Sequence, residues 1–307
     1  MQSAKLSILI SCYNQRDFIE QAMRSFYKQD YGNIEMIVLD DGSIDDSFDV
    51  IASAAADAPF PVHRYKQHNQ GAAKTFGNLA NLATGDYLLF MGGDDFVPPN
   101  ILKNRLECLE KDKNLFCASG LCRYYHNGNV GDWSFAGENN IRLNQYSASD
   151  MLALMRRYDF EKEGMLMMSS TIIRRQDFES AGGFSEKMIG DDCVLFYRLF
   201  KYAEKARKGF IVLPETVFYY RQHDNNTCKN PEAMWYRFSE LYTEFGFNSR
   251  RKASFSAYAT YMKKVRCENK WYQPDILKRI FQDRAVIKIL TLGAICRDLL
   301  LPGWGRF

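Results

Sequence analysis

Two acidic pairs follow short apolar runs in the first hundred residues. The run at 87–91 leads through Gly92-Gly93 to Asp94-Asp95, and the run at 34–39 ends in Asp40-Asp41. If both runs are parallel strands, their carboxyl ends lie at one edge of a sheet, where such sheets bind ligands. Carboxylates there can hold a divalent cation, which can in turn bind phosphate. The pattern therefore predicts a metal-assisted phosphate site.

Two further groups could carry chemistry later in the chain. Repulsion within Asp191-Asp192 should raise the proton affinity of one carboxylate toward that of a general base, and His223 could be a third metal ligand. Structural roles compete with these functions. Asp40-Asp41 could form a polar turn, Asp94-Asp95 a solvated turn and Asp191-Asp192 a helix cap.

Other side chains near the strand ends are suited to binding a nucleotide. A carboxylate such as Asp41 can accept the imide N–H of a uracil ring, and Tyr13, which follows Ser11 in the next loop, can stack on that ring. Residues 69–74 predict a loop and the start of a helix, whose amino terminus and Lys74 suit anionic groups.

Strand and helix patterns alternate in the first third, which predicts a parallel sheet covered on both faces. We expect strands at 6–11, 34–39, 62–65 and 87–91, and helices at 17–28 and 72–83. Further along, we expect helices at 100–110, 148–157 and 191–201, strands at 116–121, 169–173 and 212–220, and a loop rich in Gly and Asn at 124–144.

Composition narrows the class of protein. The chain has 307 residues, of which 46% are hydrophobic and 25% charged, and this is typical of a globular protein. The eight cysteines show no C-x-x-C pair, which favours reduced thiols and argues against structural zinc. No secretory signal is visible in residues 1–10. A cytoplasmic location is expected.

Taken in order, the segments 6–14, 35–43, 69–95, 182–198 and 219–227 resemble the family 2 glycosyltransferases of GT-A fold. The resemblance implies an α/β, Rossmann-like, mostly parallel sheet flanked by helices. It also implies a nucleotide-sugar-binding half at 1–99, an acceptor-binding half at 100–228 and a helical basic extension at 229–307.

The resemblance also implies residue roles. Ser11, Tyr13 and Asp41 would hold the uridine. Asp94 and Asp95 would meet the metal, Mn²⁺ or Mg²⁺, and the donor sugar, His223 would face the metal, and Asp192 would be the catalytic base. From their types and places alone we also expect Asp40 and Lys74 to bind the donor and Asp191 to act with Asp192. Two positions depart from the family pattern. Gly92 replaces the first Asp of the D-x-D segment, so Asp95 or His223 must compensate, and Phe76-Gly77 replaces a common Arg-Asn, which leaves the diphosphate fewer cationic partners.

The expected function is inverting transfer of a sugar from a UDP-sugar to a hydroxyl of a glycan or a lipid-diphosphate-linked acceptor, as in bacterial surface-polysaccharide synthesis. A non-catalytic module that binds sugar nucleotides or glycans is the alternative. A nucleotidyltransferase or a dinucleotide oxidoreductase would need a Gly-rich loop after the first strand, where this chain has Cys12-Tyr13-Asn14-Gln15. Nucleic acid is not an expected partner, because no recognised binding motif accompanies the basic residues.

Positive charge gathers in the last quarter. From Lys229 onward there are 15 Lys and Arg against 7 Asp and Glu, a net +8, so the preceding residues carry −5 in a chain of net charge +3. Residues 284–304 predict an amphipathic helix that is too short and too charged to span a bilayer. It could contact the inner face of the cell membrane or pack on the core.

Overall fold

The computed structural model describes residues 3–133, 137–157, 163–184, 192–224 and 226. It divides into two compact units, one of Met1–Met155 with Asp159–Gln222 and one of Arg156–Tyr158 with His223–Phe307. The sheet lies in the first unit. The predictions for Asp191 and for 284–304 fall outside the described residues, and the boundaries at 99 and 228 remain predictions. In the part that is described, no helix is both long and apolar enough to cross a membrane.

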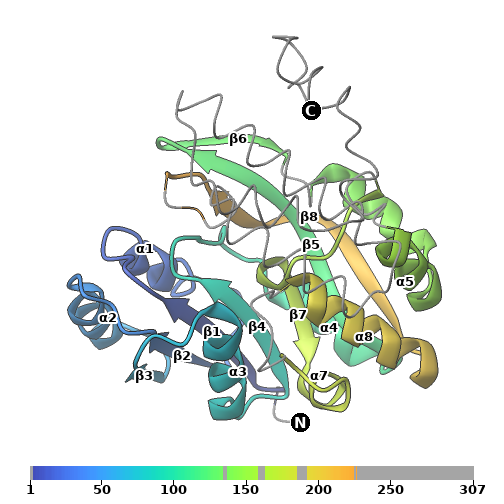
Figure 1. Cartoon of the computed structure of the whole chain (residues 1–307), viewed down its shortest axis with the longest axis horizontal. Coiled ribbons are helices and arrows are strands. Elements are labelled where there is room, and N and C mark those ends of the chain that lie inside the picture. The colour runs from blue at the N-terminus through green and yellow to red at the C-terminus, as the bar shows by residue number, and fades with distance from the viewer. Residues whose placement is uncertain (1–2, 134–136, 158–162, 185–191, 225, 227–307) are drawn as a thin grey trace, which may run out of the picture. The chain divides into compact units, whose positions relative to one another are not determined.

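The sheet has eight strands within the described residues, in the order β3-β2-β1-β4-β7-β5-β6, with β8 paired to β5 (Figure 1). The strands are β1 (Leu6–Cys12), β2 (Ile34–Asp40), β3 (Val62–Lys66), β4 (Tyr87–Gly92), β5 (Leu115–His126), β6 (Asn129–Trp133), β7 (Thr171–Arg174) and β8 (Gly209–Arg221).

The direction of the strands decides which ends meet. Strands β1 to β4 are parallel, whereas β7 is antiparallel to both β4 and β5, and β8 is parallel to β5. Two reversals restore the direction, so β8 runs the same way as β4. The carboxyl ends of β1, β2, β4 and β8 consequently lie along one edge of the sheet.

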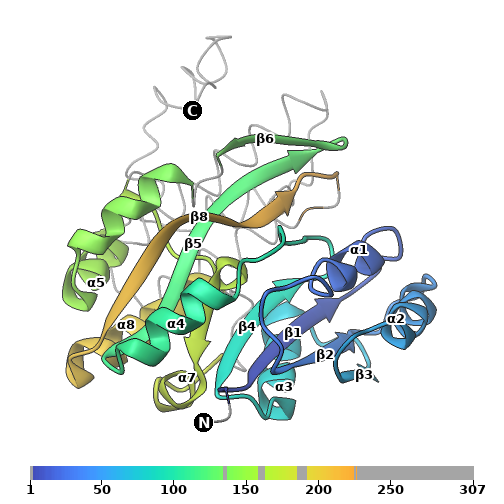
Figure 2. The same ribbon diagram turned by 180° about the vertical axis from the view of Figure 1, so that it is seen from behind.

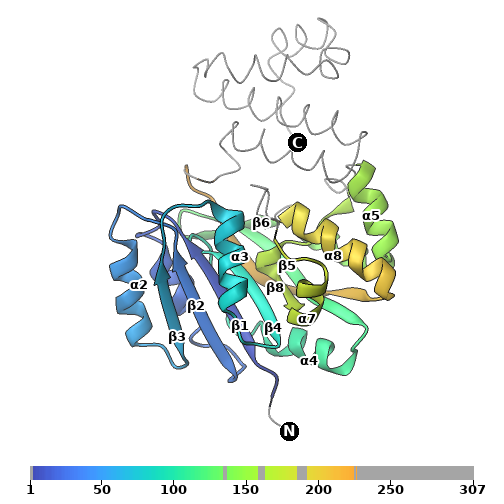
Figure 3. The same cartoon turned by 60° about the horizontal axis from the view of Figure 1, so that its bottom comes forward.

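Helices cover both faces of the sheet. One face carries α1 (Ile19–Arg24), α2 (Ser47–Ala56) and α4 (Lys103–Lys111), with α1 and α4 in front in Figure 2. The other carries α3 (Ala72–Leu82), α7 (Arg175–Ser180) and α8 (Asp192–Ala206), which lie in front of the strands in Figure 3. The other helical elements within the described ranges are η1 (Glu138–Gln145), α5 (Ala148–Arg157) and η2 (Met168–Ser170).

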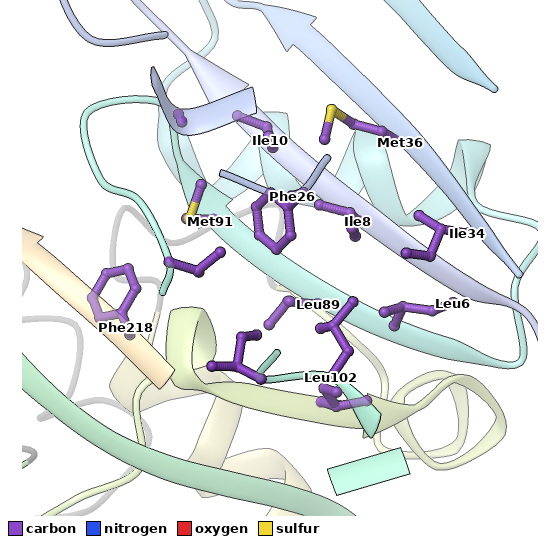
Figure 4. Close-up of a cluster of buried hydrophobic side chains, with 14 of the residues drawn as sticks. Leu6, Ile8, Ile10, Phe26, Ile34, Met36, Leu89, Met91, Leu102 and Phe218 are labelled. Atoms are coloured by element: carbon purple, nitrogen blue, oxygen red, sulfur yellow. The ribbon is translucent and has the colours of Figure 1, made fainter. Parts of the chain in front are cut away.

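Strand alternation builds the core. Leu6, Ile8 and Ile10 of β1 lie in one buried cluster with residues of α1, and Phe26, two residues after that helix, packs close to them (Figure 4). Leu9 and Cys12, among the other side chains of β1, are buried too, because helices cover both faces of the sheet, and this explains why β1 is mostly apolar, with Ser7 and Ser11 as exceptions.

One expectation is wrong. The segment 124–144, expected to be a loop, contains the end of β5, the whole of β6 and most of η1. Strands β5 and β6 form a hairpin around Asn127 and Gly128, which both have positive φ, 49° and 86°. An Asn-Gly pair between two strands favours a hairpin turn, so the sequence did contain a signal from which this hairpin could have been predicted. Helices α2 and α7 were also not predicted.

Candidate active site at the strand ends

Main-chain hydrogen bonds join the last two residues of β1 to the residues that follow β2 and β4. Asp41 N donates to the Cys12 carbonyl at 2.8 Å, and Gly93 N donates to the Ser11 carbonyl at 2.8 Å. The structure thus brings together the predicted segments at 11–14, 40–43 and 92–95. Tyr13 is 47% exposed beside them, as a stacking residue would need to be.

Asp41 is buried and holds the loop that precedes α3. Its Oδ1 accepts from Gln67 Nε2 at 2.7 Å and from Gln70 N at 2.8 Å, and its Oδ2 accepts from Gly71 N at 2.9 Å. Both oxygens therefore already have structural partners. The N–H groups of Gln70 and Gly71, just before α3, are thus bound by Asp41. The expected anion site at the amino terminus of the helix remains a prediction.

Asp40 is fully buried at the end of β2, and its two oxygens differ. Its Oδ1 accepts from Gly42 N at 3.0 Å and from Ser43 N at 2.8 Å, which fixes the turn after the strand. Its Oδ2 finds no hydrogen-bond donor among the residues that the structure describes. A buried carboxylate oxygen without a donor is rare and calls for a partner such as water or a ligand.

Asp94 and Asp95 follow β4 directly. Asp95 is 6% exposed, and burial, followed by the charges of Asp94 and Asp192, raises its pKa well above the ordinary value, against the opposing hydrogen bond from Arg221 N. A Cβ added at Gly92 would lie 2.7 Å from Asp94 Oδ1. The space of the family's first Asp is thus occupied by the carboxylate of Asp94.

Asp192 is the first residue of α8, and its negative charge contributes to the raised pKa of Asp95, so the two carboxylates lie within electrostatic range of each other. Its Oδ1 accepts from Met168 N in η2 at 2.6 Å. Arg198, on the second turn of the same helix, donates to the carbonyls of Gly182 and Gly183 at 3.1 and 3.0 Å. Neither contact was predicted.

Lys74 lies in the first turn of α3 and lines a cavity of about 520 Å³ between α3 and α7, together with Gln70, Asn78 and Glu179. The departure at Phe76 has a structural explanation. Phe76 is buried and packs on Phe90 and Phe184, with ring centroids 5.9 and 5.7 Å apart. An aromatic cluster therefore stands where the family pattern has an arginine.

The described residues supply only part of the ligand set that a divalent cation needs. No group of three His, Cys, Asp or Glu side chains within the described ranges is arranged to hold a metal. Two neighbouring carboxylates are nevertheless enough where substrate phosphates complete the coordination, which is how Mg²⁺ is usually bound. A cation would also relieve the repulsion among Asp94, Asp95 and Asp192.

His223 belongs to the second compact unit, where its N–H donates to Asn226 Oδ1 at 2.7 Å. Its role as a metal ligand remains a prediction. The same holds for the catalytic role of Asp191, which lies outside the described residues.

Solved structures share this fold. TarS from S. aureus, in complex with UDP-GlcNAc, aligns with a TM-score of 0.60 at 16% identity over 93% of this chain and 82% of that one. A mannosyltransferase from Pyrobaculum calidifontis, in complex with GDP-Man and Mn²⁺, aligns with a TM-score of 0.57 at 14% identity over 98% and 88%. The predicted GT-A architecture, a mostly parallel sheet flanked by helices, is confirmed.

The relatives found by sequence include two glucosyltransferases. A UDP-Glc:alpha-D-GlcNAc-diphosphoundecaprenol beta-1,3-glucosyltransferase of Escherichia coli is 31% identical over 37% of this chain and 45% of its own length. A GalNAc(5)-diNAcBac-PP-undecaprenol beta-1,3-glucosyltransferase of Campylobacter jejuni is 25% identical over 64% and 60%. The chain thus spans less than two thirds of either relative. The profile of glycosyl transferase family 2 matches residues 7–182, more than half of the sequence, and the chain belongs to that family.

Proposed function

We propose that this protein transfers a sugar, with inversion, from a nucleotide-diphosphate donor to a hydroxyl group of a glycan or a lipid-linked acceptor. The observation that carries the proposal is that buried Asp95, just after β4, follows Asp94 directly and feels the negative charge of Asp192 at the start of α8. Such an arrangement pairs a proton acceptor with a site for a charged leaving group. Membership of family 2 supports the same activity.

The donor side favours UDP. The buried Oδ2 of Asp40 lacks a donor within the described residues, and the imide N–H of uracil would supply one. Tyr13 lies exposed at the same edge and offers a ring for stacking. Ser11, Asp41, Lys74 and Asp94 are the remaining proposed donor contacts. The E. coli relative is named for UDP-Glc and TarS was solved with UDP-GlcNAc, whereas the Pyrobaculum enzyme was solved with GDP-Man, so the fold alone does not select the base.

In the reaction, Asp192 removes the proton of the acceptor hydroxyl, which then attacks C1 from the side opposite the diphosphate. The hydrogen bond from Met168 N orients the carboxylate of Asp192 for this step. Asp94 and Asp95, with His223 as a further candidate, would hold Mn²⁺ or Mg²⁺, which supplies a Lewis acid for the negative charge of the departing diphosphate. No covalent intermediate with the protein is needed.

The acceptor is proposed to be carried on a lipid diphosphate, and the protein to act at the inner face of the cell membrane. Two relatives are named for undecaprenol-linked acceptors, and residues 229–307 carry a net +8 that suits an anionic surface. Residues 284–304 are the proposed membrane contact.

Binding and turnover together test the proposal. UDP-sugars should raise the melting temperature of the protein more than GDP-sugars do, and Mn²⁺ should increase the shift. Asp192→Asn should lower kcat by about 10²- to 10⁴-fold while leaving donor binding intact. Asp40→Asn should instead weaken UDP binding, because its amide can present N–H toward the imide. Donor binding without transfer to any lipid-linked or glycan acceptor, equal in wild type and Asp192→Asn, would favour a non-catalytic module.

A further inference from the structure

Arg221, the last residue of β8, holds the turn that carries the two carboxylates. Its main-chain N–H donates to Asp95 Oδ1 at 2.8 Å, and its Nε donates to the Asp94 carbonyl at 2.6 Å. Its Nη2 donates to Gln21 Oε1 of α1 at 2.7 Å. A single residue thus contacts both acidic positions, although Arg221 and Asp94 lie 127 residues apart in the chain.

The guanidinium group of Arg221 also lies among three aromatic rings. Its central carbon is 4.9 Å from the ring centroid of Phe18, 5.1 Å from that of Phe96 and 5.0 Å from that of Tyr125. These rings come from three parts of the fold: the residue before α1, the residue after the acidic pair, and β5. Contacts of this kind are attractive and restrict the guanidinium group to one place.

We propose that Arg221 is a positioning residue for the Asp94-Asp95 pair, an inference that rests on the proposed donor and metal site. Its Nε binds the main chain of Asp94 and its main-chain N–H binds Asp95, so Arg221 fixes the turn that carries both carboxylates. Lysine could not replace it, because lysine has no planar fork of donors that can bind Asp94 and Gln21 while stacked on rings.

The competing explanation is that Arg221 only stabilises the fold. Main-chain hydrogen bonds that do not depend on its side chain allow the two roles to be distinguished. Tyr219 N donates to the Phe96 carbonyl at 2.9 Å, and Arg221 N binds Asp95 through its main chain. Both bonds survive any substitution at 221 except proline. A variant therefore loses only the guanidinium contacts, and β8 remains paired with the segment after β4.

The test measures Mn²⁺ binding by electron paramagnetic resonance, with and without UDP, alongside the melting temperature. Arg221→Lys should weaken Mn²⁺ binding in the presence of UDP by about 10- to 100-fold, the usual loss when a residue that orients metal ligands is changed. Arg174→Lys is the matched control. Its guanidinium carbon lies 5.2 Å from the ring of Tyr87 and its Nη2 donates to the Leu109 carbonyl at 2.7 Å, but at the opposite end of β4. This control should lower the melting temperature without changing Mn²⁺ affinity.

Two further variants keep the inference falsifiable if Arg221→Lys folds poorly. Gln21→Leu removes one acceptor of the guanidinium group and should weaken Mn²⁺ binding by about threefold, a fraction of that usual loss. Arg221→Ala leaves the three rings in place, so millimolar methylguanidinium should restore part of the lost affinity. Wild-type affinity in Arg221→Lys and Gln21→Leu would overturn the positioning role alone. Absence of Mn²⁺ and UDP binding in the wild type would overturn the proposed function as well.

Discussion

At the scale of single residues, Glu35 in β2 is the buried charge whose titration should be visible in the stability of the fold. Lys5 Nζ donates to its Oε2 at 2.6 Å, and Ser7 Oγ and Thr84 N donate to its Oε1 at 2.6 and 2.8 Å. Burial acts to raise the pKa of Glu35, but these hydrogen bonds outweigh it and lower the pKa from 4.5 to about 2.

A lowered pKa means that the carboxylate stabilises the folded state above its unfolded pKa and that this contribution is lost as the pH falls toward 2. It amounts to about 3 kcal/mol at neutral pH, of which about 2 kcal/mol should be lost by pH 3. Urea unfolding of wild type and Glu35→Gln at pH 7 and pH 3 measures this contribution. The variant should lose less free energy of unfolding than wild type between pH 7 and pH 3. Glu20→Gln, at a side chain that is 57% exposed, is the control. Equal losses in wild type and Glu35→Gln would refute the assignment.

The candidate site was predictable from sequence only in part. Asp40 and Asp94 could be placed at one edge, because each lies at or just after the end of a recognisable strand, whereas the role of Asp192 was implied by the resemblance to family 2. The binding of the loop at 67–71 by Asp41, and the bond from Met168 N to Asp192, could not be predicted. Their partners lie 24 or more residues away and are main-chain or amide groups that no pattern marks.

At the scale of elements, the turn between β2 and α2 depends on Gly42. Its φ is +81°, and an added Cβ would lie 2.8 Å from Asn69 N in the loop before α3. Gly42→Ala should therefore lower the free energy of unfolding by about 1–3 kcal/mol and shift that loop. Gly32→Ala, where an added Cβ meets nothing within 4 Å, should stay within about 0.5 kcal/mol of wild type. Chemical denaturation measures the free energy of unfolding of both variants. Equal stabilities would contradict the requirement for glycine at position 42.

The elements themselves were predictable to different degrees. Strands β1, β2 and β4 were located from sequence because a strand buried on both faces is mostly apolar, even where single polar residues such as Ser7 and Glu35 interrupt it. The antiparallel place of β7, between β4 and β5, was not visible in its four residues. Its direction is fixed only by pairing with two strands that are distant in sequence, and no periodicity records such pairing.

At the scale of the whole molecule, the sheet order explains why an active site can be assembled from such distant segments. Because β7 reverses direction once and β5 reverses it again, β8 returns parallel to β4, and Tyr219 pairs with Phe96. The turn after β4 is consequently bound from two sides, by the Ser11 carbonyl of β1 and by Arg221 of β8. Substitutions in β1 and substitutions at Arg221 can therefore each alter the position of the turn that carries Asp94 and Asp95.

The division of charge along the chain leads to a prediction for the whole protein. With +8 in residues 229–307 and −5 before them, the intact chain should bind vesicles that contain phosphatidylglycerol more tightly than vesicles of phosphatidylcholine alone, and 0.5 M salt should abolish the difference. Each basic residue at an anionic surface contributes about 1 kcal/mol, so the double change Arg284→Glu and Lys288→Glu should weaken vesicle binding by about thirtyfold or more. The matched control reverses Lys111 and Lys113, whose side chains are 76% and 65% exposed in the first unit. Cosedimentation measures both, and equal weakening would mean that net charge alone, rather than the segment 284–304, directs the protein to the membrane.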